Sequence, residues 1–100
     1  MRTVSVEAPT IDLDGSLIDF DEARFAAAWD GAMLPVLAGL QAAFASLFEG
    51  GGGWRITVAL PDGSGAVALM VAEGLRALAR SAALAWAAHG IEVECIPPST

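Results

Sequence analysis

Few side chains of this sequence could do chemistry, and they lie far apart along the chain. Asp12 and Asp14 stand two residues apart in an acidic loop built on an Asp-Gly turn. The single histidine is His89 and the single cysteine is Cys95. The chain has no tyrosine, and all five of its basic residues are arginines. A mechanism in which a phenol donates a proton beside a lysine ammonium therefore cannot be built from these residues.

The histidine and the cysteine both have structural explanations. His89 falls in the last turn of a predicted helix, directly before Gly90, a position typical of helix ends. Cys95 lies in an apolar, strand-like run, where we expect a small buried core residue. With one cysteine there is no internal disulfide, and no basic cluster in the sequence activates the thiol.

Composition indicates one small domain, residues 1–100, that hides part of its surface in an oligomer. The chain is 55% apolar and only 17% charged, a high apolar share for a chain at the size where a core is marginal. Its net charge of −7 comes from twelve acids against five arginines, and there is no basic stripe. Nucleic acid is therefore an unsuitable partner.

The N-terminus and one apolar stretch indicate where in the cell the protein is expected to reside. The opening MRTVSVEAPT lacks the apolar centre of a signal peptide, so we expect a cytoplasmic protein. Residues 31–48 carry no charge and approach the length of a short membrane span. They are rich in alanine and contain Pro35 and Gln41, which favours a buried helix in an oligomer core and no membrane association.

Periodicity predicts three strands alternating with two helices. Alternating apolar residues predict strands at 3–7, 54–60 and 91–96, and apolar residues at helical spacing predict helices at 21–48 and 66–89. The order β-α-β-α-β favours a small three-stranded parallel sheet with right-handed crossover helices. Ser5, Glu7, Glu92 and Glu94 alternate with the apolar strand residues, so one face of the sheet is expected to be wet and both helices to cover the other. The predicted fold class is α/β, a partial Rossmann-like domain.

Two segments resemble the short-chain dehydrogenase/reductase family. Residues 74–99, GLRALARSAALAWAAHGIEVECIPPS, are similar to the family's helix and strand after the catalytic lysine, with the pattern L-x-x-L-x-R-S-x-A followed by G-I-x-V-x-x-I-x-P. Residues 40–58, LQAAFASLFEGGGGWRITV, resemble the helix and central strand before its catalytic serine. The resemblance covers residues 21–99 and implies a Rossmann-like fold whose two matched helices build a four-helix dimer interface.

The motifs that the resembled family needs for catalysis are missing. The tyrosine and lysine positions of the family fall on Ala68 and Ala72, the serine position falls near Pro61, and the asparagine position falls on about Val36. The glycine-rich turn that holds a dinucleotide belongs to the first βαβ unit, and the match begins after that unit. The resemblance therefore implies a truncated protein without cofactor and without catalytic, cofactor-binding or metal-binding residues.

A shorter resemblance involves the acidic loop. IDLDGSLID, residues 11–19, is similar to the motif D-x-D-G-[ST]-L-x-D of the haloacid-dehalogenase phosphatases. That resemblance implies Asp12 as the nucleophile on phosphorus and Asp14 as acid/base, both beside magnesium. The match spans nine residues, and an ordinary acidic turn remains the preferred interpretation.

Together these observations predict a protein that acts by association. We expect a non-catalytic, short-chain-dehydrogenase-like protein that assembles as a homo-oligomer or as the partner of an active, full-length reductase. The alternatives are a metal-dependent phosphatase-like enzyme that uses segment 12–19, and a small-ligand binder at a subunit interface. The residues expected at the interface share the outer sides of the two helices: Leu34, Ala38, Gln41 and Ala45 on the first, and Met70, Ala77 and Leu84 on the second.

Overall fold

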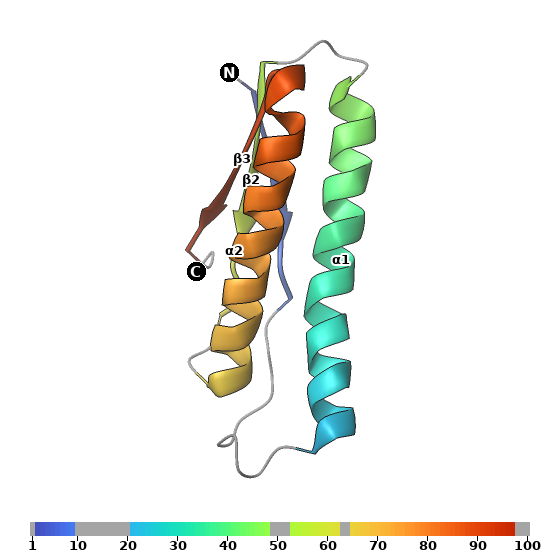
Figure 1. The fold of residues 1–100 in the computed structure, drawn as a ribbon, viewed down its shortest axis with the longest axis vertical. Helices are drawn as coiled ribbons and strands as arrows, with labels where there is room; N and C mark the ends of the chain where they lie inside the picture. Colours follow the sequence, from blue (N-terminus) through green and yellow to red (C-terminus); the bar gives the residue numbers. More distant parts are fainter. Residues whose placement is uncertain (1, 10–20, 49–52, 63–64, 98–100) are drawn as a thin grey trace.

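A computed structural model describes residues 2–9, 21–48, 53–62 and 65–97 of the chain (Figure 1). The elements follow the predicted order, and no predicted boundary is shifted by more than three residues. They are β1 (Arg2–Glu7), α1 (Glu22–Phe48), β2 (Trp54–Ala59), α2 (Ala66–Trp86), a 3₁₀ turn η2 (Ala87–His89) and β3 (Ile91–Ile96).

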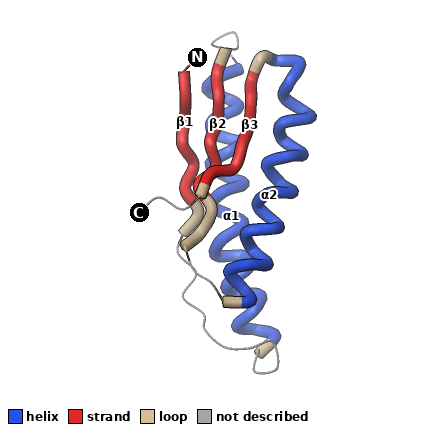
Figure 2. Tube along the Cα trace, turned by 90° about the vertical axis from the view of Figure 1, so that its left-hand side faces the viewer, coloured by secondary structure: helices blue, strands red, loops and turns tan. Residues whose placement is uncertain are grey.

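The three strands form one parallel sheet in the order β1-β2-β3. Val4 of β1 pairs with Ile56 of β2, which pairs with Val93 of β3, so apolar residues stand in register across the sheet. Both helices cover the same face, and the opposite face carries no helix of the described chain (Figure 2). This confirms the predicted α/β class and its partial Rossmann-like arrangement.

Local signals explain where α1 begins and how closely it approaches the sheet. The Oδ1 atom of Asp21 accepts a 2.8 Å hydrogen bond from the amide of Ala23, so Asp21 is the N-cap and the helix starts one residue later than predicted. Pro35 lies inside α1, which continues past it to Phe48. A β-carbon on Gly39 would come within 2.9 Å of Val6, so a glycine there lets α1 approach β1.

The end of α2 is set by a left-handed glycine. The α-helix ends at Trp86 and its last turn tightens to 3₁₀ geometry through His89, so the helix predicted over 66–89 changes type in its final residues. Gly90 has φ +73° and donates to the carbonyl of Ala87, as expected of a helix stop. Gly53, at φ +76°, precedes β2 and donates to the carbonyl of Gly90 at 2.9 Å, which aligns the starts of β2 and β3.

The core lies between the two helices and the covered face of the sheet. On α1, Val36, Leu40 and Leu47 are buried. Phe44 stacks on Trp86 of α2 with ring centroids 4.7 Å apart. Leu75 is the largest fully buried side chain of α2. The other residues of the buried cluster are Ala32, Ile56, Val58, Leu60, Val67, Val71, Ala72, Ala79 and Ile91.

The face of the sheet that carries no helix is polar, but only part of it is exposed to solvent. Ser5, Glu92 and Glu94 are exposed, as predicted. Thr57 and Ala59 of the central strand are buried, contrary to the expectation of an exposed face, because side chains of β1 and β3 flank them. Thr57 shares a 3.1 Å hydrogen bond with Ser5.

The helices extend well beyond the sheet. At 1.5 Å per residue, the 27 residues of α1 span about 40 Å, whereas a six-residue strand spans about 20 Å. The molecule is accordingly elongated, 48 × 25 × 17 Å. The N-terminal part of α1 projects past the strands and packs beside α2 (Figure 1), where Trp29 lies against Gly74.

Candidate assembly interface

The positions onto which the resemblance to short-chain reductases would place catalytic residues are packed into the core. Ala68 and Ala72 are only 4% and 9% exposed on the inner side of α2, and Val36 is fully buried on α1. Pro61, after β2, is also buried. Each apolar side chain fills interior space here, so these positions serve packing.

All seven residues predicted at the interface lie on the exposed outer side of the helix layer. We call this set, Leu34, Ala38, Gln41, Ala45, Met70, Ala77 and Leu84, the outer helix surface. Leu84 is 77% exposed and Leu34 is 58% exposed, so both leucines present apolar side chains to solvent. Their exposure follows from spacing, because steps of three, four and seven residues return to one side of a helix.

The outer helix surface is uncharged along its whole length. Residues 31–47 of α1 contain no charged side chain. An α-helix turns by about 100° per residue. On α2, the charged residues Glu73, Arg76 and Arg80 therefore lie farther from α1 than the residues of the outer helix surface do. Glu73 and Arg76 form an ion pair with each other. The residues that α1 and α2 contribute to the outer helix surface therefore border a continuous uncharged strip between the two helices.

A groove runs along this strip where α1 and α2 meet. It has a volume of about 230 Å³ and lies between Leu37 and Gln41 of α1 and Ser81 and Ala85 of α2. Sequence reasoning missed Leu37, Ser81 and Ala85, although they continue the helical spacing of the predicted rows. The volume is below the range of about 300–1,000 Å³ typical of small-molecule sites, so protein side chains fit this groove better than a ligand.

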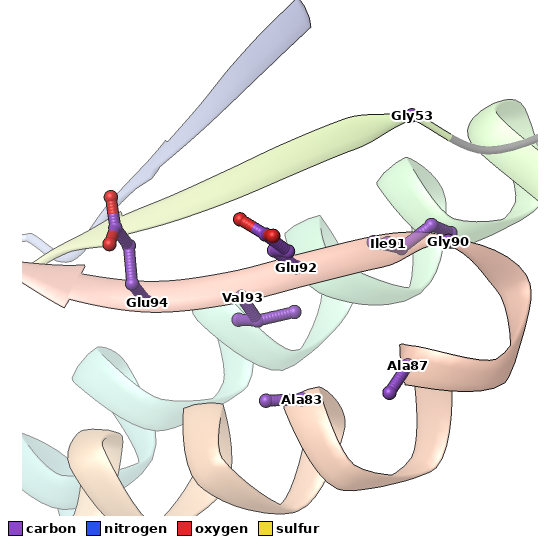
Figure 3. Close-up of a pocket in the computed structure, with 8 residues that line it drawn as sticks. All are labelled: Gly53, Ala83, Ala87, Gly90, Ile91, Glu92, Val93 and Glu94. Carbon is purple, nitrogen blue, oxygen red and sulfur yellow. The ribbon is translucent and has the colours of Figure 1, made fainter. Parts of the chain in front are cut away.

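A second hollow, of about 620 Å³, lies beside β3. Figure 3 shows Glu92 and Glu94 directed away from α2, whereas Val93, Ala83 and Ala87 line the helix side. The carboxylates face Arg55, at 3.1 Å from Glu92 and 3.9 Å from Glu94. Because the charges of this hollow are already paired, it presents mostly the edge of a strand and small apolar side chains.

The single cysteine and histidine take structural positions. Cys95 is half-buried, less than predicted, with its Sγ 3.9 Å from the carbonyl oxygen of Leu75. Burial raises the pKa of the Cys95 thiol, and the nearby Arg76 guanidinium opposes that rise. The thiol is therefore held in its neutral, unreactive form. The ring of His89 makes an edge contact with Phe44 at 5.6 Å.

Two predictions concern other kinds of site. Asp12 and Asp14 lie outside the described residues, so the acidic loop is not placed. Within the described ranges, no group of three or more His, Cys, Asp or Glu residues could hold a metal ion.

One described helix, over Glu22–Leu47, is long and apolar enough to cross a membrane by length and composition, and 22% of its apolar window is buried within the fold.

Comparison with known proteins adds no family assignment. No protein-family model matches the chain, and no curated protein matches it significantly.

Proposed function

We propose that this chain is a non-catalytic protein, similar to short-chain dehydrogenases, that acts by associating through its outer helix surface. Its partner is a second copy or an active, full-length reductase. The observation that carries the proposal is the exposure of Leu34, Met70 and Leu84 on a strip without charge. Contiguous apolar surface of this kind is typical of protein–protein interfaces.

The shape of the strip supports helix-on-helix packing. The groove between Leu37 and Ser81 offers a seat for side chains of a partner helix, and Ala38 and Ala45 let a backbone approach closely. Two copies related by a two-fold axis would present the same strip to each other, as in most homodimers. The two helices of one copy, packed on the two helices of the other, form a four-helix arrangement. This agrees with the interface that the family resemblance implies.

Sedimentation of the purified chain at low micromolar concentration tests the proposal. The wild type is expected to sediment as a dimer or larger. Ala38→Glu places a charge on the strip and is expected to break the helix contact and lower the sedimenting mass, because burying an unpaired charge is costly. Ala23→Glu is the matched control, since Ala23 is exposed in the first turn of α1, where an acid suits the helix dipole.

A folded wild-type monomer across this range would overturn the homo-oligomer. The heteromeric form predicts that the wild type, but not Ala38→Glu, co-elutes with a full-length short-chain reductase. Equal behaviour of Ala38→Glu and Ala23→Glu in both assays would show that the strip is not the contact surface.

A further inference from the structure

The two edges of the sheet differ in what they can accept. In the described part of the chain, no strand pairs with the outer side of β1 or of β3. The amide of Arg2 donates to Gly53 at 3.4 Å and that of Ala8 to Ala59 at 3.0 Å, both toward β2. Since backbone groups alternate sides along a strand, Thr3, Ser5 and Glu7 direct their N–H and C=O groups outward. The outer edge of β1, which no described strand covers, therefore offers three alternate residues for hydrogen bonding.

The edge of β3 is protected by charge. The carbonyls of Gly90 and Ile96 accept from β2 at 3.3 and 3.1 Å, so Ile91, Val93 and Cys95 face the outer edge. If two copies of β3 paired antiparallel about Val93, Glu92 of each copy would stand opposite Glu94 of the other. A shift of the register by two residues in either direction puts one of these glutamates opposite itself. Directly opposed like charges destabilise strand pairs, and charged side chains commonly protect sheet edges.

The edge of β1 has no such conflict. In an antiparallel pair of β1 strands centred on Ser5, Thr3 stands opposite Glu7 of the second copy, and Val4 stands opposite Val6. Every outward backbone group of Thr3, Ser5 and Glu7 then has a partner. The half-buried valines meet on the helix face, where β-branched pairs stabilise sheets.

We propose that two copies of this chain join through β1, antiparallel and centred on Ser5, into one continuous sheet. The two-fold axis runs through the sheet, so the helices of both copies remain on one face. The hydrogen bonds of this contact come from β1 alone, and the outer helix surface, which faces away from the sheet, stays available. The pairing is therefore a second, separate interface that does not depend on the proposed helix association.

Disulfide trapping in a Cys95→Ser background tests the register. In a hydrogen-bonded antiparallel pair, opposed α-carbons are about 5.5 Å apart, within the range that a disulfide spans. Ser5→Cys is therefore expected to give covalent dimers under mild oxidation. Thr3→Cys, on the same strand and face, is the control, because four residues of strand put the two sulfurs about 13 Å out of register. The double variant Thr3→Cys with Glu7→Cys is expected to cross-link again.

Lysines introduced on β1 test the same contact without covalent trapping. Ser5→Lys opposes two ammonium groups and is expected to weaken this association at least tenfold by sedimentation. Thr3→Lys faces Glu7 of the second copy and is expected to leave the association unchanged or tighter. Running both assays in the Ala38→Glu background separates them from the helix interface. If Ser5→Cys and the double variant cross-link no more than Thr3→Cys while circular dichroism shows folded protein, the proposal is wrong.

Discussion

The indole of Trp29 on α1 lies where a β-carbon on Gly74 of α2 would stand, with only 2.6 Å between that carbon and Cη2. Gly74 therefore fixes how closely the two helices approach. Alanine is about 1 kcal/mol more favourable than glycine inside a helix, but here the added methyl forces the ring to move. We expect Gly74→Ala to lower the free energy of unfolding by about 1 kcal/mol or more, as overpacking does.

Gly31→Ala is the control for this prediction, because a β-carbon there has nothing within 4 Å. It is expected to raise the free energy of unfolding by about 0.5–1 kcal/mol in urea denaturation. In the Trp29→Ala background the obstacle is gone, so Gly74→Ala should become stabilising as well. Destabilisation that persists in that background would show that the indole is not the cause.

Placing a tyrosine at position 68 and a lysine at position 72, as the resemblance to short-chain reductases would suggest, is expected to damage the fold. Ala68 and Ala72 are 4% and 9% exposed, so Ala68→Tyr with Ala72→Lys forces a phenol and an ammonium into a filled core. We expect a loss of about 3 kcal/mol or more in urea denaturation and no binding of NADH or NADPH by calorimetry.

Leu69→Lys provides the comparison for that double substitution. Leu69 is 59% exposed on the same helix, so a lysine there is expected to change stability by no more than about 0.5 kcal/mol. A double variant as stable as Leu69→Lys, or micromolar binding of a nicotinamide cofactor, would contradict the prediction.

The thiol of Cys95 is expected to make stability fall at alkaline pH. Burial raises its pKa above the ordinary value of 9.0. The unfolded chain therefore loses this proton at a lower pH than the folded protein, and ionisation favours unfolding. The contribution is fully present below pH 9.0 and is lost as the pH rises through the folded value.

Denaturation of the wild type and Cys95→Ala from pH 7 to 10.5 measures this effect. The difference in free energy of unfolding between them should shrink as the pH rises. Iodoacetamide should also alkylate the folded protein more slowly than the urea-unfolded chain at the same pH. Equal alkylation rates would show that the thiol is not protected.

Removing the charges of β3 is expected to let that edge pair with strands of other molecules. Glu92→Thr with Glu94→Thr replaces both carboxylates with residues favoured in strands, while the backbone groups of Val93 still face outward. We expect the variant to form larger species by light scattering at concentrations where the wild type does not. Glu73→Thr, on the exposed side of α2, removes a charge without touching the sheet and should leave the size unchanged.

The fold was largely predictable because its signals are local. Alternation predicted the strands, helical spacing predicted the helices, and Gly90 after α2 predicted a helix end that the structure places within three residues. The burial of Thr57 was not predictable in the same way, because it depends on which strands flank β2. The exposed rows on the helices followed from helical spacing, whereas the difference between the edges of β1 and β3 required the strand order and the direction of each backbone group.

The overhang of α1 beyond the sheet gives the molecule uneven local stability. Around Val36 and Leu40 the helix rests on strands whose hydrogen bonds tie distant segments together. Nearer its start, it contacts the rest of the fold through partly buried side chains such as Phe25, Ala28 and Trp29. Opening of that end leaves the hydrogen bonds of the sheet whole, so its amides should exchange with solvent through local fluctuations, while those of β2 require global unfolding. One continuous helix would then combine a weakly protected start with a well protected middle.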